Sequence, residues 1–199
     1  GDGDIGRALA ARKPKPGLTA EERVQRLVDF MVADDGLALR YQEQPTLGIA
    51  ESHAQRKVNC LSFTLMFIAL ARTYGMQAHA QASDDALAMR VLDDTVYRAT
   101  HVNAGVEIRG MEYTVDVGWR SLLAVRKPRT ISDAQAVAVL HNNNAVERLL
   151  QKDFAQAASE IGIALALDPA NPVVWSNAGV VHWRSGRNDA AEHAYLQAL

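Results

Sequence analysis

The sequence predicts an α+β domain followed by a segment of paired α-helices. Three observations carry this prediction: a long apolar run at residues 58–75, two runs of alternating polar and apolar residues at 101–108 and 111–117, and a 34-residue repeat near the end of the chain. The apolar run fits a buried helix. The alternation fits β-strands, and the repeat fits stacked helical hairpins.

Prolines set the expected domain limits. Two prolines and a glycine within residues 13–17 exclude a helix there, so residues 1–18 are predicted to form a flexible tail. The α+β domain is expected over residues 19–128, where Pro128 ends it, and helical repeats are expected over residues 129–199.

Composition narrows the class of protein. The 199 residues are 48% apolar and 22% charged, with a formal net charge of -2, so no strong field indicates a nucleic-acid partner. No run is long enough for a membrane span, and the single cysteine excludes an internal disulfide. No signal peptide is visible. The chain begins with Gly1 rather than methionine, and we interpret this start as favouring export over a cytoplasmic location.

The first part of the domain is predicted from its capping residues. Thr19 and Glu22 fit a capping box that opens a helix to about Asp34, and Thr46 is expected to cap a short helix to about Ala54. Residues 76–82 alternate as a strand does, whereas the acidic stretch 83–96 is expected to form a loop.

The only cysteine lies at the start of the apolar run. Asn59 is a good N-cap, which places Cys60 at the first helical position and Gly75 at the end of the helix. The positive end of the helix dipole favours a thiolate there. The alternative is a cysteine that packs as a small hydrophobic residue.

The alternating runs are predicted to form a β-hairpin with Arg109-Gly110 as its turn. One face is apolar, and the other carries His101, Asn103 and Asp116. With a two-residue turn, Asn103 lies opposite Asp116 and His101 lies on the diagonal. The apolar face consists of Val102, Ala104, Val106, Ile108, Met111, Tyr113, Val115 and Val117.

The cysteine and the polar face of the hairpin together supply the three groups that a thiol nucleophile needs for catalysis. Cys60 is the candidate nucleophile, His101 the base and Asp116 the acid that orients the imidazole. The Cys60 backbone N–H would meet the oxyanion, with a second donor from Gln42, Gln44 or Asn59. No cofactor is expected, and a zinc site is disfavoured because there is one thiolate and no closely spaced Cys/His pair.

The chain resembles the transglutaminase-like superfamily of papain-type cysteine enzymes over roughly residues 20–128. The spacings of 41 and 15 residues between the cysteine, histidine and aspartate fit that family, although Asn59 and Leu61 flank the cysteine where better-known members carry tryptophan or glycine. The resemblance implies a papain-like core with an antiparallel sheet and a Cys60–His101–Asp116 triad. Members variously cross-link glutamine to amines, hydrolyse amides or lack activity. The matching stretches are Asn59-Cys60-Leu61-Ser62-Phe63, Arg72-Thr73-Tyr74-Gly75-Met76-Gln77-Ala78, Thr100-His101-Val102-Asn103 and Tyr113-Thr114-Val115-Asp116.

The repeat pairs Ala157 with Ala191 and Ala164 with Ala198. With Trp175 and Gly179 in the next helix, it resembles the tetratricopeptide repeat. One repeat is expected over 137–170 and a second from Asn171, with further repeats expected beyond Leu199. The segment is either a helical lid or a concave surface for a peptide or protein partner, and we favour docking by analogy.

Two functions follow. The first is cysteine-dependent acyl transfer or hydrolysis on a peptide or protein amide. The alternative is a catalytically silent fold that acts as a repeat-based adaptor. Retention of all three catalytic residue types favours the enzyme.

Overall fold

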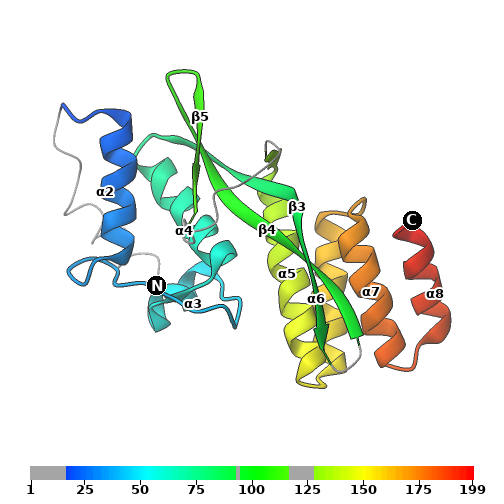
Figure 1. The fold of residues 1–199 in the computed structure, drawn as a ribbon. Coiled ribbons are helices and arrows are strands. Elements are labelled where there is room, and N and C mark those ends of the chain that lie inside the picture. The colour runs from blue at the N-terminus through cyan, green and yellow to red at the C-terminus, as the bar shows by residue number, and fades with distance from the viewer. Residues whose placement is uncertain (1–16, 93–94, 117–127) are drawn as a thin grey trace. The chain divides into compact units, whose positions relative to one another are not determined.

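The computed structural model describes residues 17–92, 95–116 and 128–199 (Figure 1). Residues 1–16 of the tail predicted at 1–18 and the predicted strand residue Val117 lie outside the described residues. The described chain divides into two compact units. The first contains residues up to Gln81 and those from Asn103 to 116, and the second contains the described residues from Ala82 to Val102 and those from 128 onward.

Helices and an antiparallel sheet both occur, which confirms the predicted α+β class. The first unit holds α2 (Ala20–Val32), β1 (Arg40–Tyr41), α3 (Ile49–Gln55), β2 (Lys57–Val58), α4 (Cys60–Thr73) and β5 (Met111–Val115). The long strands β3 (Gln77–Leu92) and β4 (Thr95–Ile108) contribute residues to both units. The second unit adds β6 (Arg129–Ile131), α5 (Asp133–Leu150), α6 (Phe154–Leu167), α7 (Pro172–Arg184) and α8 (Asn188–Gln197). The strand order is β5-β4-β3-β6, and β1 pairs with β2 in parallel.

Helix α2 begins with the predicted capping box. Thr19 Oγ1 accepts the Glu22 N–H at 3.2 Å, and Glu22 Oε2 accepts the Thr19 N–H at 2.8 Å. Two N–H groups that the helix itself leaves unpaired are thereby satisfied. Leu27 and Met31 form part of its buried face, and α2 packs against α4.

Helix α4 is the core of the first unit, as its all-round apolar sequence predicts. Phe63 and Phe67 are almost completely buried, and their rings stack with centroids 6.3 Å apart. Burying side chains of this size stabilises the fold by about 1.5–3 kcal/mol each. The helix ends at Thr73, and Gly75 follows with a positive φ of 72°, which places the turn where the sequence predicts it.

The predicted cap at Thr46 is wrong. The N-cap of α3 is Gly48, two residues after Thr46, and the Glu51 carboxylate accepts the Gly48 N–H at 3.3 Å. Thr46 is buried, and its hydroxyl oxygen accepts a hydrogen bond from the Asn59 amide at 2.9 Å. The hydroxyl is therefore used by a tertiary contact and not by a helix.

The predicted loop at 83–96 is also wrong for the residues that the structure describes. β3 continues to Leu92, and β4 resumes at Thr95. These two strands are neighbours in the sheet, so their backbone groups pair with each other despite the acidic residues. Strand formation depends on such pairing more than on local propensity.

The second unit contains two helical hairpins, α5–α6 and α7–α8, that pack side by side (Figure 1). Small residues lie at the contacts and allow close approach, with Ala157, Ala164 and Ala178 fully buried. The turns of both hairpins use a left-handed residue, Lys152 in the first and Gly186 in the second, 34 residues apart. The predicted 34-residue period therefore describes the backbone as well as the sequence.

Candidate functional site

Cys60 is the first residue of α4, as predicted. Asn59 is the N-cap, and its Oδ1 accepts the Ser62 N–H at 2.9 Å. The Cys60 N–H belongs to the first helical turn, so it has no acceptor within its own helix. The Cys60 side chain is half-buried and is not sealed in the core.

Two buried side chains fix the start of α4 to the preceding segment. Asn59 Nδ2 donates to Thr46 Oγ1 at 2.9 Å and to the Glu43 carbonyl at 3.4 Å. Ser62 Oγ donates to the Leu47 carbonyl at 2.6 Å and accepts the Leu47 N–H at 3.1 Å. Residues 43–47 are thus held against the helix terminus that carries the thiol.

Of the other predicted oxyanion donors, Gln44 lies in this segment and Gln42 directly precedes it. The backbone N–H of Gln42 donates to Val58 at 2.9 Å, which continues the β1–β2 pairing towards Asn59. The Gln42 side-chain amide donates to the carbonyl of Gln44, and the Gln44 residue is exposed. Both amide hydrogens of Asn59 point at acceptors of the protein itself. The Asn59 side chain therefore caps α4 and ties it to residues 43–47.

The predicted hairpin register is confirmed. Ile108 pairs with Met111 across the two-residue turn Arg109-Gly110, and the described pairing runs to Ala104 opposite Val115. Asn103 precedes the last paired residue of β4, and Asp116 follows the last residue of β5. Both turn residues have a positive φ, 52° for Arg109 and 77° for Gly110.

The two strands of the hairpin differ in burial. The apolar side chains of β4 are buried as predicted, with Ala104 and Val106 at most 1% exposed. On β5, Met111 is 55% exposed and Tyr113 is 36% exposed. The predicted apolar face is thus buried on β4, whereas these two side chains of the edge strand β5 remain exposed.

The polar face of the hairpin carries the candidate base and acid. Asp116 is half-buried in the first unit. His101 is half-buried on the part of β4 that belongs to the second unit, two residues before Asn103 and therefore on the same strand face. Asn103 is only 8% exposed, and its Oδ1 has no hydrogen-bond donor among the residues that the structure describes. Such an unpaired acceptor is rare in a native protein.

A polar cluster occupies the same face of the sheet across three strands. Gln81 on β3 donates to Glu112 Oε1 on β5 at 2.6 Å and accepts from Thr114 Oγ1 at 3.1 Å. His79 Nε2 lies 2.7 Å from Glu112 Oε1. Gly105 on the intervening strand β4 makes this possible, because a Cβ there would come within 3.0 Å of all three side-chain ends around it.

This cluster of His79, Gln81, Glu112 and Thr114 is not among the sites predicted from the sequence. Its signal is the alternation Gln77-His79-Gln81, which places polar side chains at every second position of a strand. The signal could have been read together with Glu112 and Thr114, which occupy the polar positions of β5. The missing information was the strand order, since it brings β3 next to β4.

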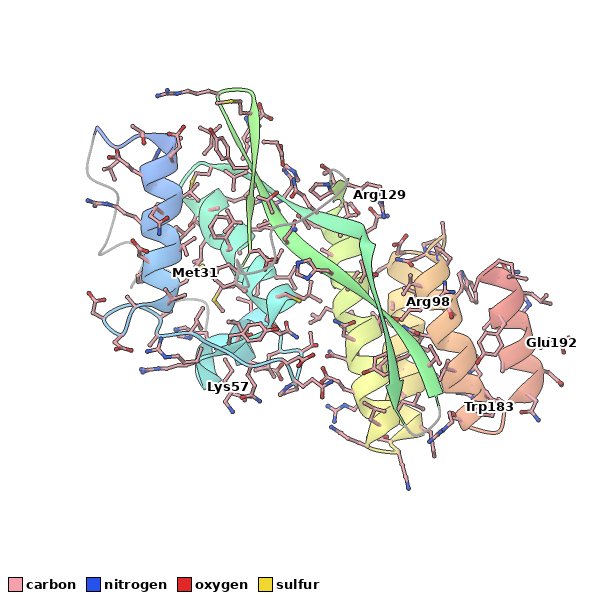
Figure 2. All side chains as sticks on the ribbon, viewed as in Figure 1. Met31, Lys57, Arg98, Arg129, Trp183 and Glu192 are labelled. Carbon is pink, nitrogen blue, oxygen red and sulfur yellow. The ribbon has the colours of Figure 1, made fainter. Side chains whose placement is uncertain are left out.

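The second unit has a hollow of about 600 Å³ along α7 and α8. Trp183 and Leu196 on its lining are 53% and 61% exposed, and Figure 2 shows Trp183 and Glu192 at these helices. Burial raises the pKa of Tyr195, another lining residue. Burial, followed by the charge of Arg187, lowers the pKa of His182 below its ordinary value of 6.5.

No three His, Cys, Asp or Glu side chains of the described residues are arranged to hold a metal ion. In the same part of the chain, no helix has the length and apolar character needed to cross a membrane. Comparisons with protein-family models, with curated proteins and with solved structures find no match to this chain.

Proposed function

We propose that this protein is a cysteine-dependent acyltransferase or amidohydrolase that acts on a peptide or protein amide. Its core would be papain-like, of the transglutaminase-like type. Cys60 is the nucleophile, His101 the general base and Asp116 the group that orients the imidazole. The position of Cys60 at the first residue of α4, half-buried behind a capped terminus, carries the proposal.

The helix terminus supports a thiolate at Cys60. Unpaired N–H groups and the positive end of the dipole stabilise a negative charge at this position. The tie between Asn59 and Thr46 holds the terminus in place before substrate arrives. A fixed donor costs little reorganisation when the oxyanion forms.

The proposed reaction proceeds through an acyl-enzyme. The Cys60 sulfur attacks the amide carbonyl carbon, and the oxyanion is met by the Cys60 backbone N–H. The imidazolium of His101 then gives its proton to the leaving amine as the carbon–nitrogen bond breaks. Water or a second amine attacks the thioester carbonyl, and His101 takes a proton from that nucleophile. The carbon–sulfur bond then breaks, and the Cys60 thiolate and the His101 imidazolium are restored.

The hairpin register supports the pairing of His101 with Asp116. If the register continued beyond Ala104 and Val115, Asn103 would lie opposite Asp116, and His101 lies two residues before Asn103 along β4. Asn103 Oδ1, to which no described residue donates a hydrogen bond, is suited to accept an N–H of the substrate amide. An amide substrate supplies such a donor on each side of the carbonyl that is attacked.

The test is the rate of Cys60 alkylation by iodoacetamide as a function of pH. We expect the rate to reach half its maximum well below about pH 8.5, where an ordinary thiol does so. His101→Ala should move the midpoint upward, whereas His79→Ala, the matched histidine on β3, should leave it in place. Equal profiles for the wild type and His101→Ala would overturn the triad.

The substrate class is tested in parallel. The wild type should release ammonia from, or couple a fluorescent primary amine to, a glutamine-rich protein, and Cys60→Ser should do neither. Ammonia without amine incorporation identifies a hydrolase, and incorporation identifies a transferase.

A second candidate function is that of a repeat-based adaptor that binds a protein partner. The exposed Trp183 and Leu196 beside the hollow of α7 and α8 favour it, because large apolar side chains gathered at a surface often mark a binding site. An unreactive Cys60 in the alkylation experiment would make this function the better one.

A further inference from the structure

Residue Asn177 makes an unusual contact with a strand. It lies on α7 and is 1% exposed, yet its side chain pairs with the backbone of Arg98 on β4. Asn177 Oδ1 accepts the Arg98 N–H at 3.1 Å, and Asn177 Nδ2 donates to the Arg98 carbonyl at 2.9 Å. Both residues belong to the second unit, and Figure 2 marks Arg98 on β4.

The Asn177 amide is itself held by a second asparagine. The other hydrogen of Asn177 Nδ2 is donated to Asn142 Oδ1 on α5 at 2.9 Å, and Asn142 is 2% exposed. The orientation of the Asn177 amide is therefore fixed from behind by a neighbouring helix. A fully satisfied buried polar group of this kind specifies one arrangement, because any displacement leaves polar atoms unpaired.

The contact uses the N–H and C=O of Arg98, which lies beyond the described pairing of β4 with β5. The described pairing between β4 and β5 covers Ala104 to Ile108, so it ends well before Arg98. The N–H and C=O of one strand residue point to the same side, and a neighbouring strand would use both of them. The Asn177 carboxamide offers one acceptor and one donor with this same spacing.

We propose that Asn177 is a positioning residue, which fixes the segment of β4 that carries His101. His101 follows Arg98 by three residues on the same continuous strand. This inference rests on the proposed function, because His101 matters only if it acts as the base for Cys60. On this proposal, the surface of α7 around Asn177 binds strand β4 of the same chain.

The test uses the full chain with Asn177→Leu, which has a similar shape but no hydrogen-bonding groups. Asn143→Leu is the matched control, since Asn143 lies 34 residues earlier, at the equivalent repeat position, and outside these three hydrogen bonds. In Asn177→Leu we expect amide exchange at Arg98 to quicken by about tenfold, as the loss of a net hydrogen bond predicts. The midpoint of Cys60 alkylation should move towards that of His101→Ala. The control should change neither.

Arg98→Pro gives the same test from the strand side and covers the case in which Asn177→Leu unfolds the helices. It removes the N–H that Asn177 accepts and leaves every side chain of the repeat helices in place. We expect its alkylation profile to move in the same direction as that of Asn177→Leu.

The outcomes separate the two proposals. A profile that moves in His101→Ala but stays at the wild-type position in Asn177→Leu and Arg98→Pro overturns the positioning role alone. A profile that does not move in His101→Ala overturns the proposed function and, with it, the positioning role. A parallel shift in all three variants supports both.

Discussion

Glu112 and His79 meet across the strand that separates them, with Glu112 Oε1 at 2.7 Å from His79 Nε2. The Gly105 backbone lies between them, and the absence of a side chain there lets the two groups approach. Gln81 joins the same carboxylate oxygen from a position that is 1% exposed. The edge strand β5 is thereby tied to β3 by side chains as well as to β4 by its backbone.

Gly105→Ala should destabilise the first unit by about 1–3 kcal/mol. The new methyl group displaces the ends of His79, Gln81 and Glu112 and leaves the buried Gln81 amide poorly paired. The measurement is urea unfolding. Gly162→Ala on α6 is the control, because its Cβ meets nothing within 4 Å, and it should stabilise the helix by about 0.5–1 kcal/mol. Equal effects of the two substitutions would contradict the clash.

Asn103→Leu should leave stability unchanged or raise it, while it lowers turnover of an amide substrate. No described residue donates a hydrogen bond to Asn103 Oδ1, so the removal of this oxygen should relieve a desolvation cost. Thermal unfolding and steady-state amide turnover measure the two effects. A variant that loses stability and keeps its turnover would show that Asn103 is structural.

Asn59→Ala should cost about 2 kcal/mol of stability. It removes a helix cap and also leaves the buried Thr46 hydroxyl without its donor. Asn59→Asp retains the acceptor for the Ser62 N–H and should lose less. If the two variants unfold at the same urea concentration, the cap is not the larger contribution.

Gly179→Ala should destabilise the α7–α8 hairpin by about 1–3 kcal/mol. A Cβ at Gly179 would come within 3.0 Å of the Tyr195 ring, which cannot bend away as a flexible side chain does. The loss of helical circular dichroism on heating measures this. In the Tyr195→Leu background the same substitution should cost less, and an identical cost there would exclude the ring as the cause.

Stability should fall on acidification through the titration of His182. Its pKa is lowered in the folded protein, so the unfolded chain binds a proton first as the pH falls below about 6.5. The full contribution of neutral His182 to the free energy of unfolding is present above pH 6.5. It is lost as the pH falls towards the lower pKa that His182 has in the folded protein. Unfolding midpoints between pH 5 and pH 8 should slope in the wild type and flatten in His182→Gln. A slope retained by His182→Gln would place the effect elsewhere.

Local chemistry was sufficient to predict several parts of the fold. The capping box at Thr19, the start of α4 at Cys60 and the turn at Arg109-Gly110 depend on residues within a few positions of one another. The 34-residue period likewise appears as two similar helical hairpins. These features need no knowledge of distant contacts.

Tertiary contacts decided the remainder. Thr46 serves the Asn59 amide and not a helix, and residues of the expected loop pair as β3 and β4 because each strand satisfies the other's backbone. The sequence by itself determined where α2 and α4 begin and where the turn Arg109-Gly110 lies, because these caps and this turn use neighbouring groups. Only the tertiary structure decided that Asn177 pairs with Arg98 and that Glu112 reaches His79, because those partners lie 79 and 33 residues apart.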